Sequence, residues 1–267
     1  MSSDPVPLID VGAFGRVDDE RDAEAYVRWM DHQRRAAPDH TVDLLAPGSD
    51  TRVLDLGCGT GVDLVALCER TSRATGLDRS TTMARAARRR TAGSGASIVV
   101  GDGVALPFDD DRFDGCSARA VLVHTAEPGR VVHEIARVVR PGGRVVLSEP
   151  DHGTHVVATD HQDTFGAILA HRRTTFANPR VGRRLADLAI DAGLDVTAVW
   201  ATPIVHRSYE AVLAAGGPFG RAVDAAVEAG AISREDAERY DASLRELDER
   251  GGFVFAAMAM TVAAAVP

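Results

Sequence analysis

The chain has 267 residues, enough for one large α/β domain, with 39 acidic against 30 basic residues and a formal net charge of −9. This charge disfavours phosphate backbones and anionic lipid as partners, so we expect neither a nucleic-acid-binding nor a membrane protein. The three cysteines show no paired spacing, which excludes a disulfide framework and a cysteine zinc site. Since the amino-terminal residues also lack a signal-peptide pattern, we expect a cytoplasmic protein.

The first predicted elements are helical. Residues of about 22–45 carry apolar side chains near helical spacing, among them Tyr26 and Met30, and Pro38 interrupts the run. We therefore expect a helix pair before the core of the fold, and we assign about 1–45 to an amino-terminal helical lid.

From residue 52 onward, short apolar and β-branched segments alternate with helical patterns. The predicted strands are residues 52–56, 73–77, 97–100, 113–117, 144–148, 194–201 and 253–264. Strands that alternate with helices pair in parallel, and right-handed crossovers place the helices on both faces of the sheet. The expected fold class is therefore α/β, with a doubly wound, seven-stranded, mostly parallel sheet and helical lid elements.

The regular alternation loosens after Glu149, where a polar segment rich in histidine begins. We interpret about 150–180 and 205–250 as cap insertions within a single domain, because no linker is long enough to separate two domains. His152 and His155 have a spacing found among metal ligands, but HxxH without a third ligand is a weak signal, and we expect no metal.

The strongest motif is an apolar strand that runs directly into a glycine loop, VLDLGCGTG at residues 53–61. Glycine lets the backbone turn tightly and approach a ligand closely. The spacing is GxGxG, and a dinucleotide fingerprint would place its third glycine at Val62 instead. Asp55 and Asp63 beside the loop would also repel a pyrophosphate. The motif therefore favours a nucleoside without a pyrophosphate.

Two further acidic residues follow predicted strands. Asp78 lies about 20 residues beyond the glycine loop, the separation at which a carboxylate meets ribose hydroxyls. The alternative is that Asp78 or Ser80 only caps the helix that begins near Thr81. Asp102, between two glycines, can accept a hydrogen bond from an adenine amino group, although such a sequence alone also suits a turn.

These motifs occur with three shorter ones, LPF at 106–108, FD at 113–114 and RPGG at 140–143. Together they resemble the class I S-adenosylmethionine-dependent methyltransferases, especially small-molecule enzymes akin to ubiquinone and menaquinone methyltransferases. The resemblance is close over about 52–149 and looser elsewhere. It implies a Rossmann-like methyltransferase fold, S-adenosyl-L-methionine as cofactor, and a small-molecule acceptor methylated on O, N or C.

The resemblance also implies a set of cofactor-binding residues at the ends of the first four strands. They are Asp55, Gly57, Cys58, Gly59, Gly61, Asp78, Arg79, Asp102, Gly103 and Arg119. By the resemblance, Asp55 and the glycine loop border the methionine moiety, and Arg119 lies near the same cofactor. Asp78 with Arg79 holds the ribose and the neighbouring adenine face, and Asp102 with Gly103 holds the adenine. We interpret Cys58 as a small residue that fits the loop, not as a nucleophile.

His124 is the candidate general base, because it follows the fourth strand and ligands gather at the carboxyl ends of parallel strands. The alternative is that it only ties down a loop. Glu149 and Asp151 follow the next strand, so one of them could orient the acceptor. Two other activities stay open: a cyclase or lyase built on the same cofactor-binding fold, and an NAD-dependent dehydrogenase, which the glycine spacing disfavours. The sequence gives no oligomeric state.

Overall fold

The computed structural model describes residues 40–215 and 218–267, and the predicted helix pair with Tyr26 and Met30 falls largely outside them. Within these ranges seven strands form one sheet, in the order β3-β2-β1-β4-β5-β7-β6. The strands are β1 (Val53–Leu56), β2 (Ala74–Asp78), β3 (Ser97–Val100), β4 (Phe113–Arg119), β5 (Val139–Val157), β6 (Asp195–His206) and β7 (Phe255–Ala265). Strands β1 to β5 pair in parallel and β7 runs antiparallel to both neighbours, which confirms the predicted fold class.

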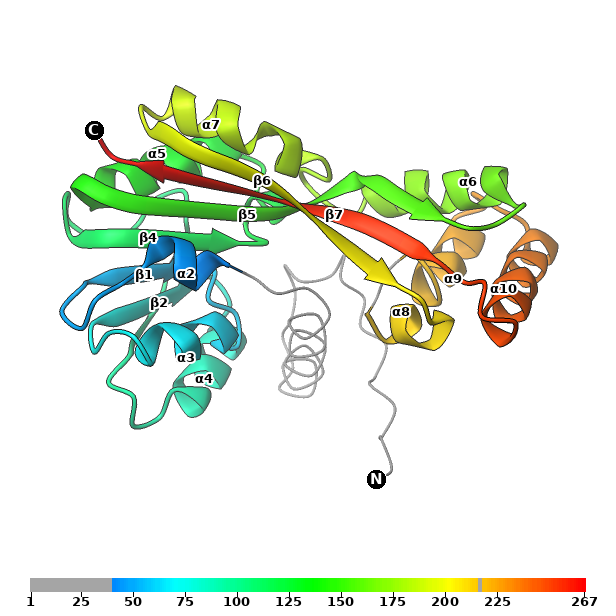
Figure 1. Cartoon of the computed structure of the whole chain (residues 1–267), viewed down its shortest axis with the longest axis horizontal. Helices are drawn as coiled ribbons and strands as arrows, with labels where there is room; N and C mark the ends of the chain where they lie inside the picture. Colours follow the sequence, from blue (N-terminus) through cyan, green and yellow to red (C-terminus); the bar gives the residue numbers. More distant parts are fainter. Residues whose placement is uncertain (1–39, 216–217) are drawn as a thin grey trace.

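Helices cover both faces of the parallel part of the sheet (Figure 1). Within the described residues, the helices are α2 (Thr41–Leu45), α3 (Val62–Cys68), α4 (Thr81–Arg90), η2 (Leu122–His124), α5 (Pro128–Val138), α6 (Gln162–Arg173), η3 (Val181–Arg184), α7 (Leu185–Asp191), α8 (Tyr209–Ala215), α9 (Arg221–Glu228) and α10 (Arg234–Glu249). The largest core joins β1, β4 and β5 to α5 and α7, and a smaller core joins β1 to α2 and α3. Because both of its faces are covered, every residue of β1 is buried, as expected for a central parallel strand.

Strand β5 is much longer than the sequence predicts. The polar segment after Glu149 continues as a strand to Val157, so the expectation of an insertion starting near 150 is wrong for residues 150–157. These residues pair with β7, where Val157 lies opposite Phe255, and an irregularity in the register between Asp151 and Val156 interrupts the ladder. Strand pairing uses backbone groups, so it is compatible with polar side chains. A search for apolar runs in the sequence therefore misses this part of β5.

The far ends of β5, β6 and β7 carry a second group of helices, here called the helical lobe: α6, α8, α9 and α10 (Figure 1). These helices share a core of their own with the strand ends, in which Phe165, Tyr240, Leu244 and Phe253 are buried. The expected cap insertion at about 205–250 contains α8, α9 and α10. After α9, Gly230 adopts a left-handed conformation (φ 70°), and Ser233 then caps α10.

Candidate active site

The glycine loop joins the end of β1 to the start of α3. Gly57, Gly59 and Gly61 all have positive φ values, of 70°, 53° and 82°, a region that residues with a side chain rarely adopt. A Cβ on Gly57 would collide with the side chain of Val121, and one on Gly61 would lie 3.2 Å from the Cα atom of Ala87 in α4. The backbone therefore approaches its neighbours as closely as the motif predicts, and the contact of these glycines with a cofactor stays a prediction.

Asp78 at the end of β2 is bound to the glycine loop. One carboxylate oxygen accepts the backbone N–H of Gly59 at 2.8 Å, and the other accepts the N–H of Ser80 at 2.9 Å. The cap of α4 is Ser80, whose Oγ accepts the N–H of Met83 at 3.3 Å, so capping is not the sole role of Asp78. Burial raises the pKa of Asp78, and the hydrogen bonds from backbone N–H groups lower it in part. The geometry brings this acid and the glycine loop together, as a nucleoside site requires.

Asp55 lies beneath the glycine loop and is only 3% exposed. One of its oxygens accepts the hydroxyl of Ser117 at 3.4 Å, and the other, Oδ2, has no hydrogen-bond partner. Burial first, and then the charge of Asp63, raise the pKa of Asp55 well above its ordinary value, while Arg119 lowers it. Arg119 itself makes two hydrogen bonds of 2.7 and 3.0 Å to Asp63. A buried carboxylate oxygen without a donor is costly, and an amino group such as that of a methionine moiety would satisfy it.

The remaining predicted cofactor residues differ in exposure. Arg79 and Asp102 are exposed, and Asp102 accepts the N–H of Val104 at 3.1 Å. Cys58 is buried, and its sulfur packs so closely on Gly76 of β2 that a Cβ there would lie 2.8 Å from it. Burial raises the pKa of the Cys58 thiol well above its ordinary value. The Cys58 side chain is therefore a packing group, in agreement with its interpretation as a non-nucleophile.

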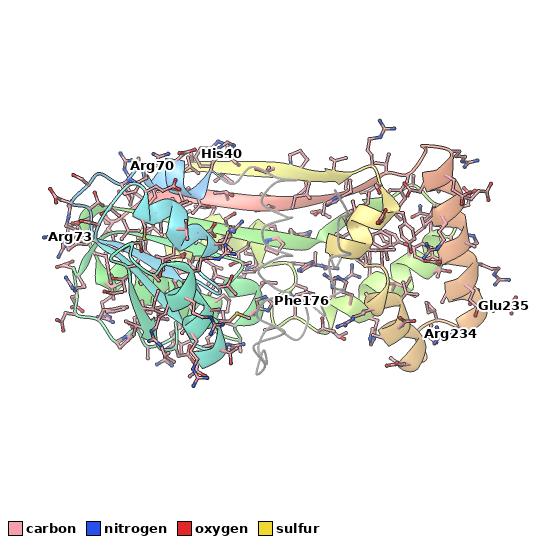
Figure 2. All side chains as sticks on the ribbon, turned by 90° about the horizontal axis from the view of Figure 1, so that it is seen from below. His40, Arg70, Arg73, Phe176, Arg234 and Glu235 are labelled. Atoms are coloured by element: carbon pink, nitrogen blue, oxygen red, sulfur yellow. The ribbon has the colours of Figure 1, made fainter. Side chains whose placement is uncertain are left out.

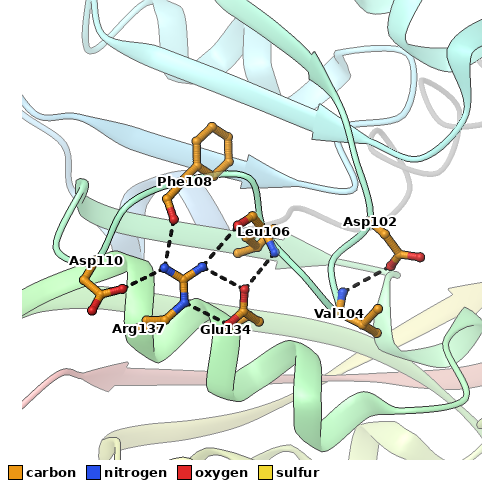
Figure 3. A network of polar contacts seen from close by, with 7 residues as sticks. All are labelled: Asp102, Val104, Leu106, Phe108, Asp110, Glu134 and Arg137. Carbon is orange, nitrogen blue, oxygen red and sulfur yellow. Dashed lines mark hydrogen bonds and ion pairs between the residues drawn. The ribbon is translucent and has the colours of Figure 1, made fainter.

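Two residues of α5 hold the loop between β3 and β4, in which Asp102 lies (Figure 3). The Arg137 guanidinium donates to the carbonyl oxygens of Phe108 at 2.8 Å and Leu106 at 3.1 Å, and it pairs with Glu134 at 2.8 Å. Glu134 in turn accepts the N–H of Leu106 at 2.7 Å. Sequence analysis missed this network. The spacing of three residues predicts that Glu134 and Arg137 share one side of a helix, but nothing in it indicates which loop they bind.

His124 is the last residue of η2, directly after β4, and is half-buried. Its ring centroid lies 5.7 Å from that of Phe176, which is located between the sheet and the helical lobe (Figure 2). Burial, together with the positive charge of Arg79, lowers the pKa of His124 to about 4. The ring is therefore neutral at pH 7. Its orientation toward a transferred methyl group stays a prediction.

Glu149 and Asp151, the two acids expected near an acceptor, are both engaged by the protein. Glu149 is 1% exposed and accepts the backbone N–H groups of residues 121–123 at 2.7, 2.7 and 3.2 Å. Asp151 accepts from Arg183 at 2.6 and 2.9 Å and from the N–H of Gly153 at 2.8 Å. Each carboxylate thus already binds protein groups, so the prediction that one of them orients the acceptor directly finds no support.

The histidines of the HxxH pattern pack against each other. The rings of His152 and His155 are 5.3 Å apart, and His152 stacks on Phe176 at 4.1 Å. Within residues 40–215 and 218–267, no group of three or more His, Cys, Asp or Glu side chains is arranged to hold a metal ion. None of the helices in these two ranges has the length and apolar character needed to cross a bilayer.

Residues 54–147 match the protein family described as a methyltransferase domain. This segment is a methyltransferase domain. It contains the glycine loop, Asp78, Asp102 and η2, so the site described above falls within the matched region. The resemblance predicted from the motifs is thereby confirmed.

Relatives extend the comparison beyond the methyltransferase domain. An uncharacterized 37.1 kDa protein in transposon TN4556 of Streptomyces fradiae is 35% identical over 204 residues, which are 74% of this chain and 59% of that protein. A demethylmenaquinone methyltransferase of Clavibacter sepedonicus is 38% identical over 110 residues, 41% of this chain and 45% of that enzyme. The chain thus spans about half the length of the curated relatives it matches.

A solved structure shares the fold over almost the whole chain. A geranyl diphosphate methyltransferase in complex with SAM aligns with a TM-score of 0.55 at 17% identity, covering 97% of this chain and 96% of that one. At this identity the likeness concerns the fold alone.

Proposed function

We propose that this chain transfers a methyl group from S-adenosylmethionine to O, N or C of a small-molecule acceptor. The observation that carries the proposal is the 2.8 Å hydrogen bond between Gly59 N–H and the Asp78 carboxylate. It places an acid beside a glycine loop with three left-handed residues and no pyrophosphate spacing. The match of residues 54–147 to a methyltransferase domain supports the same activity.

The residues of the site suit S-adenosylmethionine better than a dinucleotide. In the proposal, Asp78 accepts the ribose hydroxyls, with Arg79 on the neighbouring adenine face, and Asp55 accepts the amino group of the methionine moiety through its unpartnered oxygen. Asp102 and Gly103 meet the adenine. The loop has Val62 where a dinucleotide fingerprint places its third glycine, and this spacing disfavours the two phosphates of NAD.

Bound in this site, the cofactor supplies a methyl group that its positively charged sulfur has already activated. The protein must then align the acceptor and exclude water, and these effects supply most of the rate. His124 would take a proton from an acceptor that must lose one, since the neutral ring predominates at pH 7. A base with a pKa of about 4 is weaker than the optimum for general base catalysis near neutral pH, which leaves alignment as the main contribution.

The direct test is the formation of S-adenosylhomocysteine from S-adenosylmethionine in the presence of a panel of phenols, amines and carbon acids. We expect formation that depends on an acceptor and is lost in Asp78→Ala. Calorimetry should show that S-adenosylhomocysteine binds more tightly than NAD. Tighter binding of NAD contradicts the proposal, and binding of S-adenosylmethionine without methyl transfer to any acceptor indicates the cyclase or lyase alternative.

The same proposal places the enzyme in the cytoplasm, with a small molecule as its partner. The three cysteines are all free, which suits a reducing compartment. The formal net charge of −9 disfavours a nucleic acid as the acceptor.

A further inference from the structure

The short helix η2 is held at its start by a single buried carboxylate. Glu149, in the middle of β5, accepts the N–H groups of residues 121–123, which no helical hydrogen bond can satisfy. The side chain is 1% exposed, so water cannot replace it. Burial raises the pKa of Glu149 to about 7, and the three backbone N–H donors oppose this rise. In its ionised form the side chain makes charge-assisted hydrogen bonds, which are among the strongest in proteins. The start of η2 is therefore fixed to the sheet.

The other side of η2 is held by the chain segment that leaves the helical lobe. Asn178, between α6 and η3, donates its backbone N–H to the carbonyl oxygen of Val123 at 3.0 Å. Its side-chain amide donates to the carbonyl oxygen of Thr125, the residue after η2. Glu149 thus binds the N–H groups of this turn and Asn178 binds its carbonyl groups, and we call these two residues the η2 clamp.

The residues of η2 connect the two halves of the candidate site. Val121, at its start, packs on Gly57 so closely that a Cβ on the glycine would collide with it. His124, at its end, lies beside Phe176. A displacement of η2 would change the distance between the glycine loop and His124, and misplacement of about 1 Å at a reacting centre costs up to about 10²-fold in rate.

We propose that Glu149 and Asn178 are positioning residues for methyl transfer: they hold η2 so that His124 and the acceptor beside it stand at a fixed distance from the glycine loop. This inference rests on the proposed function. Neither residue contacts the reacting atoms in it. Both act through η2, and one of them does so from the segment that leads out of the helical lobe.

The test compares Glu149→Gln with Asp151→Asn. Both changes neutralise a buried acid of β5, but Asp151 binds Arg183 and Gly153 instead of η2. The measurements are hydrogen exchange of the amides of residues 121–123, affinity for S-adenosylhomocysteine, and kcat and KM with an acceptor found by the panel above. Asn178→Ala provides a second variant at a half-buried loop position, should Glu149→Gln fail to fold.

We expect Glu149→Gln to speed amide exchange at residues 121–123 by about 10-fold or more, because these N–H groups lose a charged acceptor. Asn178→Ala removes a neutral hydrogen bond from the same turn, so it should speed this exchange by about 2- to 10-fold. The kcat should fall by about 10²-fold, whereas the affinity for S-adenosylhomocysteine should hardly change, and Asp151→Asn should leave exchange in η2 as it is. Unchanged exchange, or an unchanged kcat per folded enzyme in both clamp variants, overturns the proposal. If the unsubstituted protein binds no S-adenosylhomocysteine, the proposed function has failed, and exchange still reports on the clamp.

Discussion

The backbone N–H of Gly59 and the carboxylate of Asp78 form a 2.8 Å hydrogen bond between two segments that are 19 residues apart in sequence. The bond joins the loop after β1 to the end of β2, two neighbouring parallel strands. A carboxylate has capacity for several hydrogen bonds, so Asp78 can hold the loop and still accept a ribose hydroxyl. In the proposed function, one side chain would therefore serve both the shape of the loop and the binding of a nucleoside.

Replacement of Asp78 by Ala should weaken the binding of S-adenosylhomocysteine by about 10- to 100-fold, since a charged hydrogen bond contributes about 1.5 to 3 kcal/mol. It should also lower the free energy of unfolding by about 1 to 3 kcal/mol, because the N–H groups of Gly59 and Ser80 lose their acceptor. Calorimetry and urea unfolding measure the two effects. Asp109→Ala removes an exposed acid of the β3–β4 loop and is the control. If Asp78→Ala lowers stability but leaves the affinity for S-adenosylhomocysteine unchanged, Asp78 has only a structural role.

Replacement of His124 by Gln should lower kcat by about 10²- to 10⁴-fold if the acceptor must lose a proton. Affinity for S-adenosylhomocysteine should hardly change. His133→Gln, at an exposed position of α5, is the matched control. Turnover per folded enzyme equal to that of the unsubstituted protein would mean that His124 only fixes its loop, the alternative that the sequence leaves open.

Replacement of His152 by Phe should make the protein less sensitive to acid. Burial lowers the pKa of His152 from 6.5 to about 2, so the unfolded chain takes up a proton below about pH 6.5 that the folded chain does not. The free energy of unfolding is therefore unaffected by His152 protonation above about pH 6.5, and it decreases as the pH falls below that value. With these two pKa values, the protein should lose about 2 kcal/mol of unfolding free energy through His152 between pH 7 and pH 5.

Urea unfolding of both proteins at pH 7 and pH 5 checks this prediction. Phe can keep the stacking on Phe176 and removes the buried Nδ1 atom, which has no hydrogen-bond partner, so the variant should be at least as stable at pH 7. Equal losses of stability in the two proteins on acidification would show that His152 does not keep its depressed pKa.

Replacement of Arg137 by Met should loosen the loop between β3 and β4. The carbonyl oxygens of Leu106 and Phe108 lose their donor, and the free energy of unfolding should fall by about 1 to 3 kcal/mol. Binding of S-adenosylhomocysteine should weaken as well, because the same loop carries Asp102. Arg130→Met removes an exposed partner of Glu127 on the same helix and should have little effect on either measurement. A loss of stability without weaker binding of S-adenosylhomocysteine would mean that the hydrogen bonds of Arg137 stabilise the loop but do not affect the cofactor site.

The sequence predicts the parallel half of the fold well, because there the local signals agree. In β1 the apolar run, the glycine loop and the start of α3 all indicate one strand–turn–helix unit. The structure contains this unit, and its strand begins at Val53 instead of Arg52 and ends at Leu56 as predicted. Beyond Glu149 the signals disagree. Residues such as Asp151 and His152 lie on β5 although their side chains are polar. Asp151 binds Arg183 of η3, and the ring of His152 stacks on Phe176. A local pattern cannot contain that information.

The difference between local and long-range contacts also explains which site residues the sequence could predict. Asp55, Asp78 and the glycines belong to motifs whose spacing is set by neighbouring strands, so sequence suffices to bring them together. The contacts of Glu149 with η2, of Asn178 with Thr125 and of Arg137 with the β3–β4 loop connect residues 26 to 53 positions apart, and only the packed fold shows them. The expectation that Glu149 or Asp151 orients the acceptor stays a prediction, and the fold shows that Glu149 binds the N–H groups of residues 121–123.

Strands β5, β6 and β7 all continue from the sheet into the helical lobe, although the pairing of β5 with β7 is irregular between Asp151 and Val156 (Figure 1). A two-domain enzyme with a single linker can open at that linker, but here three hydrogen-bonded strands would have to bend together. In the proposed function, the acceptor would then enter by movement of loops and helices over these strands. It also follows that the helical lobe cannot be cut out or exchanged as a cassette, because any such graft would sever strands that belong to both cores.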